Sequence, residues 1–349
     1  MAGNGTIAAI DADGHILERS ADIARYLEGD FAGRKGAMWP GGQPWDADLG
    51  GKLGMKGYGY GRELDPAGQV AFWEKLLDDY GMDYAVLFPT GSGGMVRLQE
   101  PGFAEAATRA ANTHFAKDFK TDRLRPVGVL PLRNPAASVE ELRHIHGLGL
   151  RAVEVLTIGL PYALGNPFFD PVWQEAEKLD IAICVHGTRG AHEEWGADKL
   201  GSFSEVHAYA FPAGMLLQFT SVLCNAIPLK FPKLKWGFLE IGAAWLPYYL
   251  TRLDEHWQTR RRADMKQLDR KPSDLFRESE IIVSLEADEP YLAQTVEFAG
   301  EDHIVFASDV PHWDGEFPGN LKHIRRTNEV GESVKQKILH DNAKRFFGL

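Results

Sequence analysis

The chain has few cysteines and no long hydrophobic run. Its 349 residues include two cysteines, Cys184 and Cys224, each inside an apolar segment and neither at the spacing of a metal or disulfide framework. No stretch approaches the roughly 18 apolar residues of a membrane-spanning helix. The first residues also lack the basic and apolar regions of a signal peptide. These absences predict a cytoplasmic protein with reduced, buried thiols and no membrane partner.

Basic residues are outnumbered as well. The sequence has 38 Lys and Arg against 49 Asp and Glu, so its formal net charge is −11. That balance argues against nucleic acid and anionic membranes as main partners. An anionic small molecule is still compatible, because a bound metal ion would dominate the field around it. We therefore expect a small-molecule substrate as the partner.

Two common catalytic motifs are missing. There is no Gly-x-Ser-x-Gly turn, which excludes the nucleophile elbow of serine hydrolases. The Gly-rich segment at 57–61 lacks the Lys-Ser/Thr pair of a phosphate-binding loop. Neither serine-based catalysis nor nucleotide binding is supported by the sequence.

Short apolar runs alternate with amphipathic stretches along the whole chain. The runs cover residues 7–10, 84–88, 127–130, 150–156, 181–185, 234–239, 281–285 and 304–307. The amphipathic stretches cover residues 67–80, 102–118, 136–147, 170–179, 213–227, 244–260, 289–299 and 333–346. Eight strand-then-helix units predict an α/β fold, a (β/α)₈ TIM barrel in one domain over 1–349. An open doubly wound sheet is the structural alternative.

Two long segments interrupt this alternation. Residues 29–66 are rich in Gly, Trp and Tyr and follow the first run, and residues 187–211 follow the fifth. Loops after the strands of a barrel lie at its catalytic face. We therefore expect both segments to be insertions beside the active site.

Polar residues stand where several apolar runs end. Asp13 and His15 follow the first run and point the same way if the strand continues. His186 ends the fifth run and Asp309 follows the eighth. Each has a plain structural alternative, as a turn, a cap or a satisfied histidine. Together they would converge at one mouth of a closed barrel, so the sequence predicts one divalent metal ion there, with Zn²⁺ first and Mn²⁺ or Fe²⁺ as alternatives.

The sequence resembles the metal-dependent amidohydrolase superfamily over nearly its whole length. Within it, the chain is most similar to the branch that contains aminocarboxymuconate-semialdehyde decarboxylase and γ-resorcylate decarboxylase. The resemblance is carried by residues 11–18, 166–173, 185–187, 231–235, 245–254, 307–312 and 341–343. It implies a (β/α)₈ barrel with one metal, whose acid-x-His variant matches Asp13-Gly14-His15. It also implies ligand roles for His186 and Asp309.

One position departs from the family pattern. Many members have a catalytic histidine after the sixth strand, where this chain has Glu240. A carboxylate cannot replace an imidazolium as a cationic group, although it could act as a base or hold a nearby histidine. A salt-bridged structural carboxylate is the alternative. His207, in the second long segment, is the candidate to supply the missing imidazole.

Two reactions follow from this pattern, and the sequence leaves both open. The resemblance implies decarboxylation of an aromatic or unsaturated cyclic acid, with Asp309 passing a proton to the carbon that loses CO₂. The alternative is hydrolysis of an amide, ester, lactone or C–C bond, with Asp309 accepting a proton from water and Glu240 or His207 orienting the reactants. A non-catalytic ligand-binding barrel is a minor third hypothesis.

Aromatic and basic residues at the expected catalytic face are candidate substrate contacts. Trp39, Trp195 and Trp313 could stack on a flat ring or simply close the loops over the barrel. His312, at the end of the motif 307–312, is a further candidate, and Arg133 could bind a carboxylate or form a surface salt bridge. The resemblance further implies a homo-oligomer, either a dimer or a tetramer.

Overall fold

The fold was described from a computed structural model, which covers residues 7–34, 64–188, 195–285 and 289–349. Every strand pair in the described residues is parallel, and the strands follow one another in sequence order in two hydrogen-bonded groups, β1 to β3 and β4 to β9. The strands are β1 (Ala9–Ile16), β2 (Met82–Pro89), β3 (Leu124–Pro126), β4 (Gly128–Val129), β5 (Ala152–Leu156), β6 (Ala182–His186), β7 (Trp236–Phe238), β8 (Ile281–Leu285) and β9 (Ile304–Phe306).

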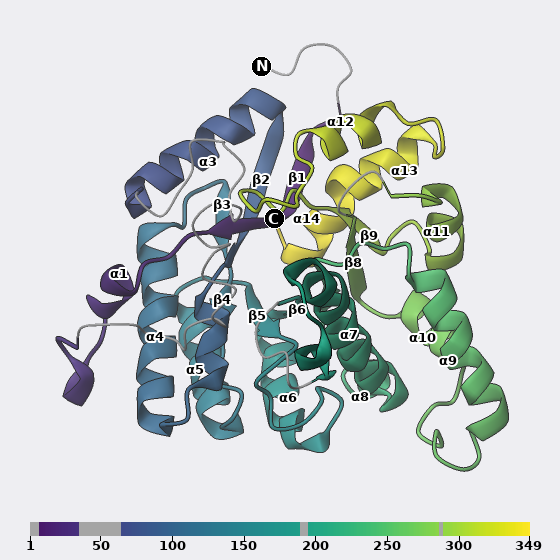
Figure 1. Ribbon diagram of the computed structural model, residues 1–349, viewed down its shortest axis with the longest axis horizontal. Coiled ribbons are helices and arrows are strands. Elements are labelled where there is room, and N and C mark those ends of the chain that lie inside the picture. The colour runs from purple at the N-terminus through teal and green to yellow at the C-terminus, as the bar shows by residue number, and fades with distance from the viewer. Residues whose placement is uncertain (1–6, 35–63, 189–194, 286–288) are drawn as a thin grey trace.

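Backbone hydrogen bonds join the two groups into a barrel. Only Val127 separates β3 from β4, and its N–H donates to Leu87 of β2 at 2.9 Å, so β3 and β4 occupy one strand position. At the other seam, Asp309 N donates to Asp13 O, and His15 N donates to Val310 O, both at 2.8 Å. The purple first strand accordingly lies beside the yellow C-terminal elements in Figure 1. The predicted (β/α)₈ barrel is confirmed, and the open-sheet alternative is wrong.

Helices surround the strands (Figure 1). The eight predicted amphipathic stretches contain or overlap α3 (Pro66–Tyr80), α4 (Pro101–Asp118), α5 (Pro135–Gly147), α6 (Asp170–Leu179), α7 (Phe203–Cys224), α9 (Leu246–Arg260), α11 (Leu292–Ala299), and α13 (Glu332–Gln336) with α14 (Asn342–Phe347). The shorter α1 (Ser20–Ala24), α8 (Ile227–Lys230), α10 (Pro272–Glu278) and α12 (Gly319–Arg326) were not expected from the sequence. Among the described helices, none combines the length and apolar content needed to cross a membrane.

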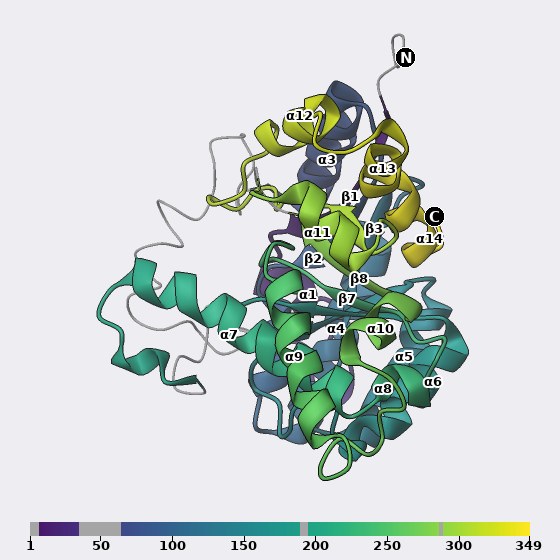
Figure 2. The same ribbon diagram turned by 90° about the vertical axis from the view of Figure 1, so that its right-hand side faces the viewer.

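The predicted loop over 187–211 is wrong at its C-terminal end, because α7 begins at Phe203. Ser202 caps this helix, and its side chain accepts a hydrogen bond from Glu205 N at 3.3 Å. Glu205 Oε2 in turn accepts from Ser202 Oγ at 2.8 Å and from Gly201 N at 3.1 Å, so the Ser-x-x-Glu sequence marks the start of the helix. His207 therefore stands on a helix. Figure 2 shows the first turns of α7 extending outward from the barrel.

Apolar side chains fill the inside of the barrel. A second apolar layer packs the strands against the surrounding helices. The inner cluster contains Ile10, Ala12, Val86, Phe88, Cys184, Ile282 and Val305, closed by Phe346 and Phe347 of α14. Cys184 is buried as predicted, whereas Cys224 is partly exposed. The interior is thus packed, and room for a ligand is left at the carboxyl ends of the strands.

A bulge in β1 sets the direction of the polar residues at its end. Asp11 pairs with Ala85 and Gly14 with Leu87, so residues 11 to 14 oppose residues 85 to 87. A bulge bends a strand and redirects its side chains. A Cβ at Gly14 would overlap the ring of Trp73 from α3, whose Nε1 donates to His15 O at 3.2 Å.

We expect Gly14→Ala to destabilise the protein by about 1–3 kcal/mol, because the added methyl must displace a buried indole. Gly147→Ala, where nothing lies within 4 Å of the added Cβ, is the matched control and should change stability little. The measurement is urea unfolding of both variants. Equal midpoints for the two variants would contradict this account of Gly14.

Candidate active site

The structure brings the four predicted metal ligands together at one mouth of the barrel. Asp13 and His15 lie in β1, His186 is the last residue of β6, and Asp309 follows β9. Asp13 Oδ1 is 3.5 Å from His15 Nε2 and 3.3 Å from His186 Nε2, and His15 Nε2 is 3.1 Å from Asp309 Oδ1. All four residues are buried.

These separations fit a shared cation. Oxygen and nitrogen ligands about 2.1 Å from a tetrahedral ion lie about 3.4 Å from one another. The three distances above range from 3.1 to 3.5 Å. Asp13, His15 and His186 form one group in which the ligand atoms all lie within 4.8 Å of one another, and Asp309 belongs to a second such group, with His15, Glu240 and His312. The donor set therefore suits a divalent metal ion.

Asp11 ties the two sides of this cluster to each other. Its buried carboxylate accepts hydrogen bonds from Ser308 N at 2.9 Å, from Ser308 Oγ at 2.5 Å and from Asp13 N at 3.2 Å. Burial raises the pKa of Asp11 to about 7, although these hydrogen bonds oppose the shift. Its position holds β1 against the segment that carries Asp309.

Glu240 contacts a candidate ligand. Its Oε2 lies 2.9 Å from His186 Nδ1, on the far side of the ring from the Nε2 that faces Asp13. Burial raises the pKa of Glu240 to about 7, against the opposing effect of His186. For His186 itself, burial acts to lower the pKa, but Glu240 and Asp13 outweigh it and raise the pKa well above its usual value. Of the roles left open by the sequence, this geometry favours orientation of His186.

Both Glu240 and Asp309 have left-handed backbones, with φ of 71° and 54°. Such conformations cost free energy for residues other than glycine and gather at functional sites. The turn after Glu240 is held by Glu289, which accepts hydrogen bonds from Ala243 N and from Ala244 N, each at 2.8 Å. The surrounding structure therefore fixes the direction in which the Glu240 side chain points.

Glu154 is a site residue that the sequence analysis missed. It lies in β5, is buried, and its Oε1 is 3.8 Å from His186 Nδ1. Burial raises the pKa of Glu154 to about 8. The available signal was a lone glutamate in the otherwise apolar strand Ala152–Leu156, since a carboxylate is rarely buried without a partner or a role.

His312 lies closer to the cluster than the sequence analysis placed it. Its Nδ1 donates to Asp309 Oδ1 at 2.7 Å, and its ring centroid is 4.0 Å from that of His15. Burial lowers the pKa of His312, but the Asp309 carboxylate outweighs this effect and raises it to about 9. For Asp309, burial acts to raise the pKa, but His312 and His15 together hold it well below its usual value. The pair therefore holds a proton at His312 beside an ionised Asp309.

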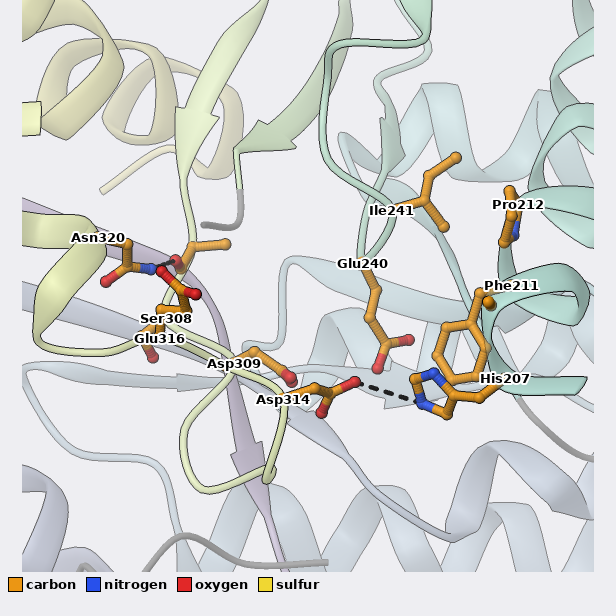
Figure 3. A pocket seen from close by; sticks show the side chains of 13 residues that line it. His207, Phe211, Pro212, Glu240, Ile241, Ser308, Asp309, Asp314, Glu316 and Asn320 are labelled. Carbon is orange, nitrogen blue, oxygen red and sulfur yellow. Dashed lines mark hydrogen bonds and ion pairs between the residues drawn. The ribbon is translucent and has the colours of Figure 1, made fainter. Parts of the chain in front are cut away.

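A cavity of about 330 Å³ opens beside these groups (Figure 3). Its lining in the described residues is His207, Ala208, Phe211, Pro212, Glu240, Ile241, Ala307, Ser308, Asp309, Asp314, Gly315, Glu316 and Asn320. His207 Nε2 is 3.3 Å from Asp314 Oδ2, and Phe211 and Trp313 flank the imidazole ring. His207 thus borders the cavity but stands on its outer wall.

Two other predicted substrate contacts, Arg133 and Trp195, do not line this cavity. Arg133 Nη1 donates to Gly159 O, and Arg133 lines a second cavity with Met95 and Val96. Trp195 packs near Ala197 and Val206 at the start of α7. Trp39 lies outside the described residues.

The fold and the cluster define a class: a parallel (β/α)₈ barrel with a metal-ligand set at the carboxyl ends of its strands. Residues 10–349 match the family model described as amidohydrolase. The chain therefore belongs to the amidohydrolase family.

The chain is also similar to curated relatives and to solved structures. It is 27% identical over 242 residues to a 2-amino-3-carboxymuconate-6-semialdehyde decarboxylase of Dictyostelium discoideum, covering 68% of this chain and 65% of that protein. It is 25% identical over 292 residues to a γ-resorcylate decarboxylase of a Rhizobium species, covering 79% and 86%. A dihydroxybenzoic acid decarboxylase from a Polaromonas species, solved with manganese and 2-nitroresorcinol, superimposes with a TM-score of 0.72 at 21% identity, covering 98% of this chain and 97% of that chain.

We expect His186→Ala to abolish stoichiometric metal binding, because it removes the only nitrogen ligand that β6 contributes to the cluster. Metal content after dialysis against Mn²⁺ or Zn²⁺ measures this, and His186→Gln provides a better-filled variant if the alanine form is unstable. His256→Ala, which removes an exposed imidazole, is the control and should keep its metal. Full occupancy in both His186 variants would refute the ligand set.

Proposed function

We propose that this protein is a metal-dependent decarboxylase of an aromatic or unsaturated cyclic carboxylic acid. The observation that carries the proposal is the contact of 2.7 Å between His312 Nδ1 and Asp309 Oδ1, which puts an imidazole beside a carboxylate of the metal-ligand cluster. The adjoining cavity of about 330 Å³ is of the size that takes one small ring. The decarboxylase relatives at 27% and 25% identity support the same reaction.

One divalent metal ion is part of the proposal, held by Asp13, His15, His186 and Asp309. When bound, such an ion supplies Lewis-acid polarisation of substrate oxygens. Two imidazoles with two carboxylates accept Zn²⁺, Mn²⁺ or Fe²⁺. The manganese in the Polaromonas enzyme supports Mn²⁺ beside the Zn²⁺ that the sequence favoured. A homo-oligomer also remains a prediction from the family resemblance.

In this proposal, one pair of side chains handles the proton and a third side chain orients a metal ligand. His312 stores the proton, and Asp309 Oδ1 accepts its hydrogen bond and faces the cavity. Delivery of that proton to the ring carbon replaces the C–CO₂ bond with C–H and releases CO₂. Glu240 orients His186, while Phe211 and Ile241 exclude water from one side of the ring.

Hydrolysis is the second candidate, and Glu240 is the observation that favours it. Its carboxyl lines the cavity, and burial raises its pKa to about 7, which suits a general base at neutral pH. A water molecule deprotonated there could attack an amide, ester or lactone carbonyl. The two candidates differ in whether water contributes an oxygen atom to the organic product.

Isotope incorporation should separate the two reactions. We expect the metal-loaded enzyme to release CO₂ from a member of a panel of hydroxybenzoates, and to place deuterium from D₂O on the carbon that lost it. Mass spectrometry of the product is the measurement, and Asp309→Asn should lower the rate by about 10²-fold or more. Incorporation of ¹⁸O from water into the organic product, from a panel of cyclic amides and lactones, would instead establish the hydrolase.

The pH dependence should report His312. The raised pKa of about 9 keeps this imidazole protonated below that pH, so activity that needs its proton should fall as the pH rises through about 9. His312→Gln cannot store the proton, so we expect kcat to drop by about 10²- to 10⁴-fold and this basic limb to vanish. His256→Gln is the exposed control and should retain the limb. A limb that persists in His312→Gln assigns the proton to another group.

A further inference from the structure

Two buried carboxyl groups approach the same nitrogen of His186. Glu240 Oε2 lies 2.9 Å from Nδ1, and Glu154 Oε1 lies 3.8 Å from it. The carbonyl oxygen of Gly187 is a third acceptor, at 3.1 Å. The other ring nitrogen, Nε2, faces Asp13 at 3.3 Å, so a metal ion bound on that side leaves the ring proton on Nδ1. A single N–H group therefore has more acceptors around it than it needs.

Glu154 has no other visible role in the described part of the chain. Its carboxyl is buried, its only ion pair among the described residues is with His186, and its Oε2 has no hydrogen-bond partner there. The strand register sets Glu154 opposite Cys184, two residues before His186, so it approaches the imidazole from deeper in the barrel. A buried polar atom without a partner costs free energy, which indicates a function for the group that carries it.

Glu240, in contrast, is shared between the metal-ligand cluster and the cavity. It lines the cavity of about 330 Å³, and its Oε1 is 3.9 Å from His312 Nδ1. Figure 3 shows the carboxyl of Glu240 extending into the space between Asp309 and His207. A carboxyl that turns toward a molecule in this space cannot hold His186 at the same time.

A glycine lies against each of the two carboxyl groups. A Cβ at Gly187 would lie 2.8 Å from Glu240 Oε2, and a Cβ at Gly93, in the segment after β2, would overlap Glu154 Oε2. The space left at Gly93 therefore accommodates one oxygen of Glu154, while its other oxygen faces His186. Both carboxyl groups thus have room beside the imidazole.

We propose that Glu154 is a positioning residue, which accepts the Nδ1–H hydrogen bond of His186 when Glu240 turns toward a molecule in the cavity. The carboxyl of Glu154 has to advance by only about 1 Å to reach hydrogen-bond distance. His186 then keeps its Nε2 directed at the cation while Glu240 is engaged elsewhere. The proposal rests on the metal site of the proposed function and applies to either reaction.

The test is a double-mutant cycle on metal affinity. Glu154→Met and Glu240→Met keep the length of the side chain but remove the carboxylate that accepts the hydrogen bond. The dissociation constant of Mn²⁺ is measured by titration calorimetry on metal-free protein, without substrate. We expect each single variant to weaken binding by about threefold and the double variant by about 10²-fold, roughly ten times the product of the single effects.

Three further measurements identify the cause. Glu154→Gln in the Glu240→Met background retains an acceptor oxygen and should recover most of the affinity that Glu154→Met loses there. In Zn²⁺-loaded protein, the Nδ1–H proton resonance of His186 should persist in each single variant and disappear by exchange in the double variant. Glu297→Gln, on the exposed face of α11, removes one negative charge far from the imidazole and should leave the dissociation constant unchanged.

Two outcomes would overturn the role of Glu154. One is a double variant whose loss equals the product of the single losses, and the other is a Glu154→Met substitution without effect in both backgrounds, which would assign the N–H to Gly187 alone. Urea unfolding of the metal-free proteins checks the fold, and Glu240→Ala replaces Glu240→Met in the cycle if the double variant is unfolded.

This test is distinct from that of the reaction. A wild-type protein that binds no Mn²⁺ would refute the metal site and this proposal together. The expected synergy without CO₂ release would support Glu154 and refute the decarboxylase, while CO₂ release with independent single effects would do the reverse.

Discussion

The hydrogen bonds of the Asp11 carboxylate are the interaction on which the candidate site depends. They join the first strand to Ser308 across the seam where the barrel closes. On one side of this seam stand Asp13 and His15, and on the other stand Asp309 and His312. Residues almost 300 positions apart in sequence therefore keep separations near 3 Å, because a buried carboxylate that lost these donors would carry a large desolvation cost.

Concentrated negative charge is the second constraint on the site. Asp13, Glu154, Glu240 and Asp309 lie around His15, His186 and His312 in a largely buried region. Their pKa values separate, since Glu154 and Glu240 are raised by burial while Asp309 is held low by its histidines. Titratable groups whose environments shift their pKa values in opposite directions are typical of functional sites.

Local pattern was sufficient to predict the barrel and the residues at its strand ends. Apolar runs recur with strand length, and a polar residue that ends such a run must lie at the mouth, so Asp13, His186 and Asp309 could be placed without coordinates. Glu154 could not, because a single carboxyl within an apolar strand reveals its partner only when β5 and β6 are aligned. The exclusion of Arg133 from the main cavity likewise depends on its contact with Gly159, which lies beyond the next strand.

The contact between His312 and Asp309 could not be predicted from the sequence for a different reason. The spacing of His312 from Asp309 is short, but the left-handed backbone at Asp309 turns the two side chains toward each other, and no propensity predicts that conformation for aspartate at this position. The start of α7 could have been predicted from the sequence, because Ser202 and Glu205 have the Ser-x-x-Glu spacing that is typical of a helix N-terminus. The Gly- and Trp-containing sequence before Ser202 is typical of a loop, so it favoured a loop over a helix in this region.

The residues around the candidate site stand on elements of different local stability, strands on one side and the start of α7 on the other. Asp13, His15 and His186 lie on strands, whereas His207 lies near the start of α7, a helix whose first turns extend outward from the barrel. Helix ends open locally at much lower free energy than central strands. The first turns of α7, which carry His207, therefore open more readily than β1 and β6, which carry Asp13, His15 and His186.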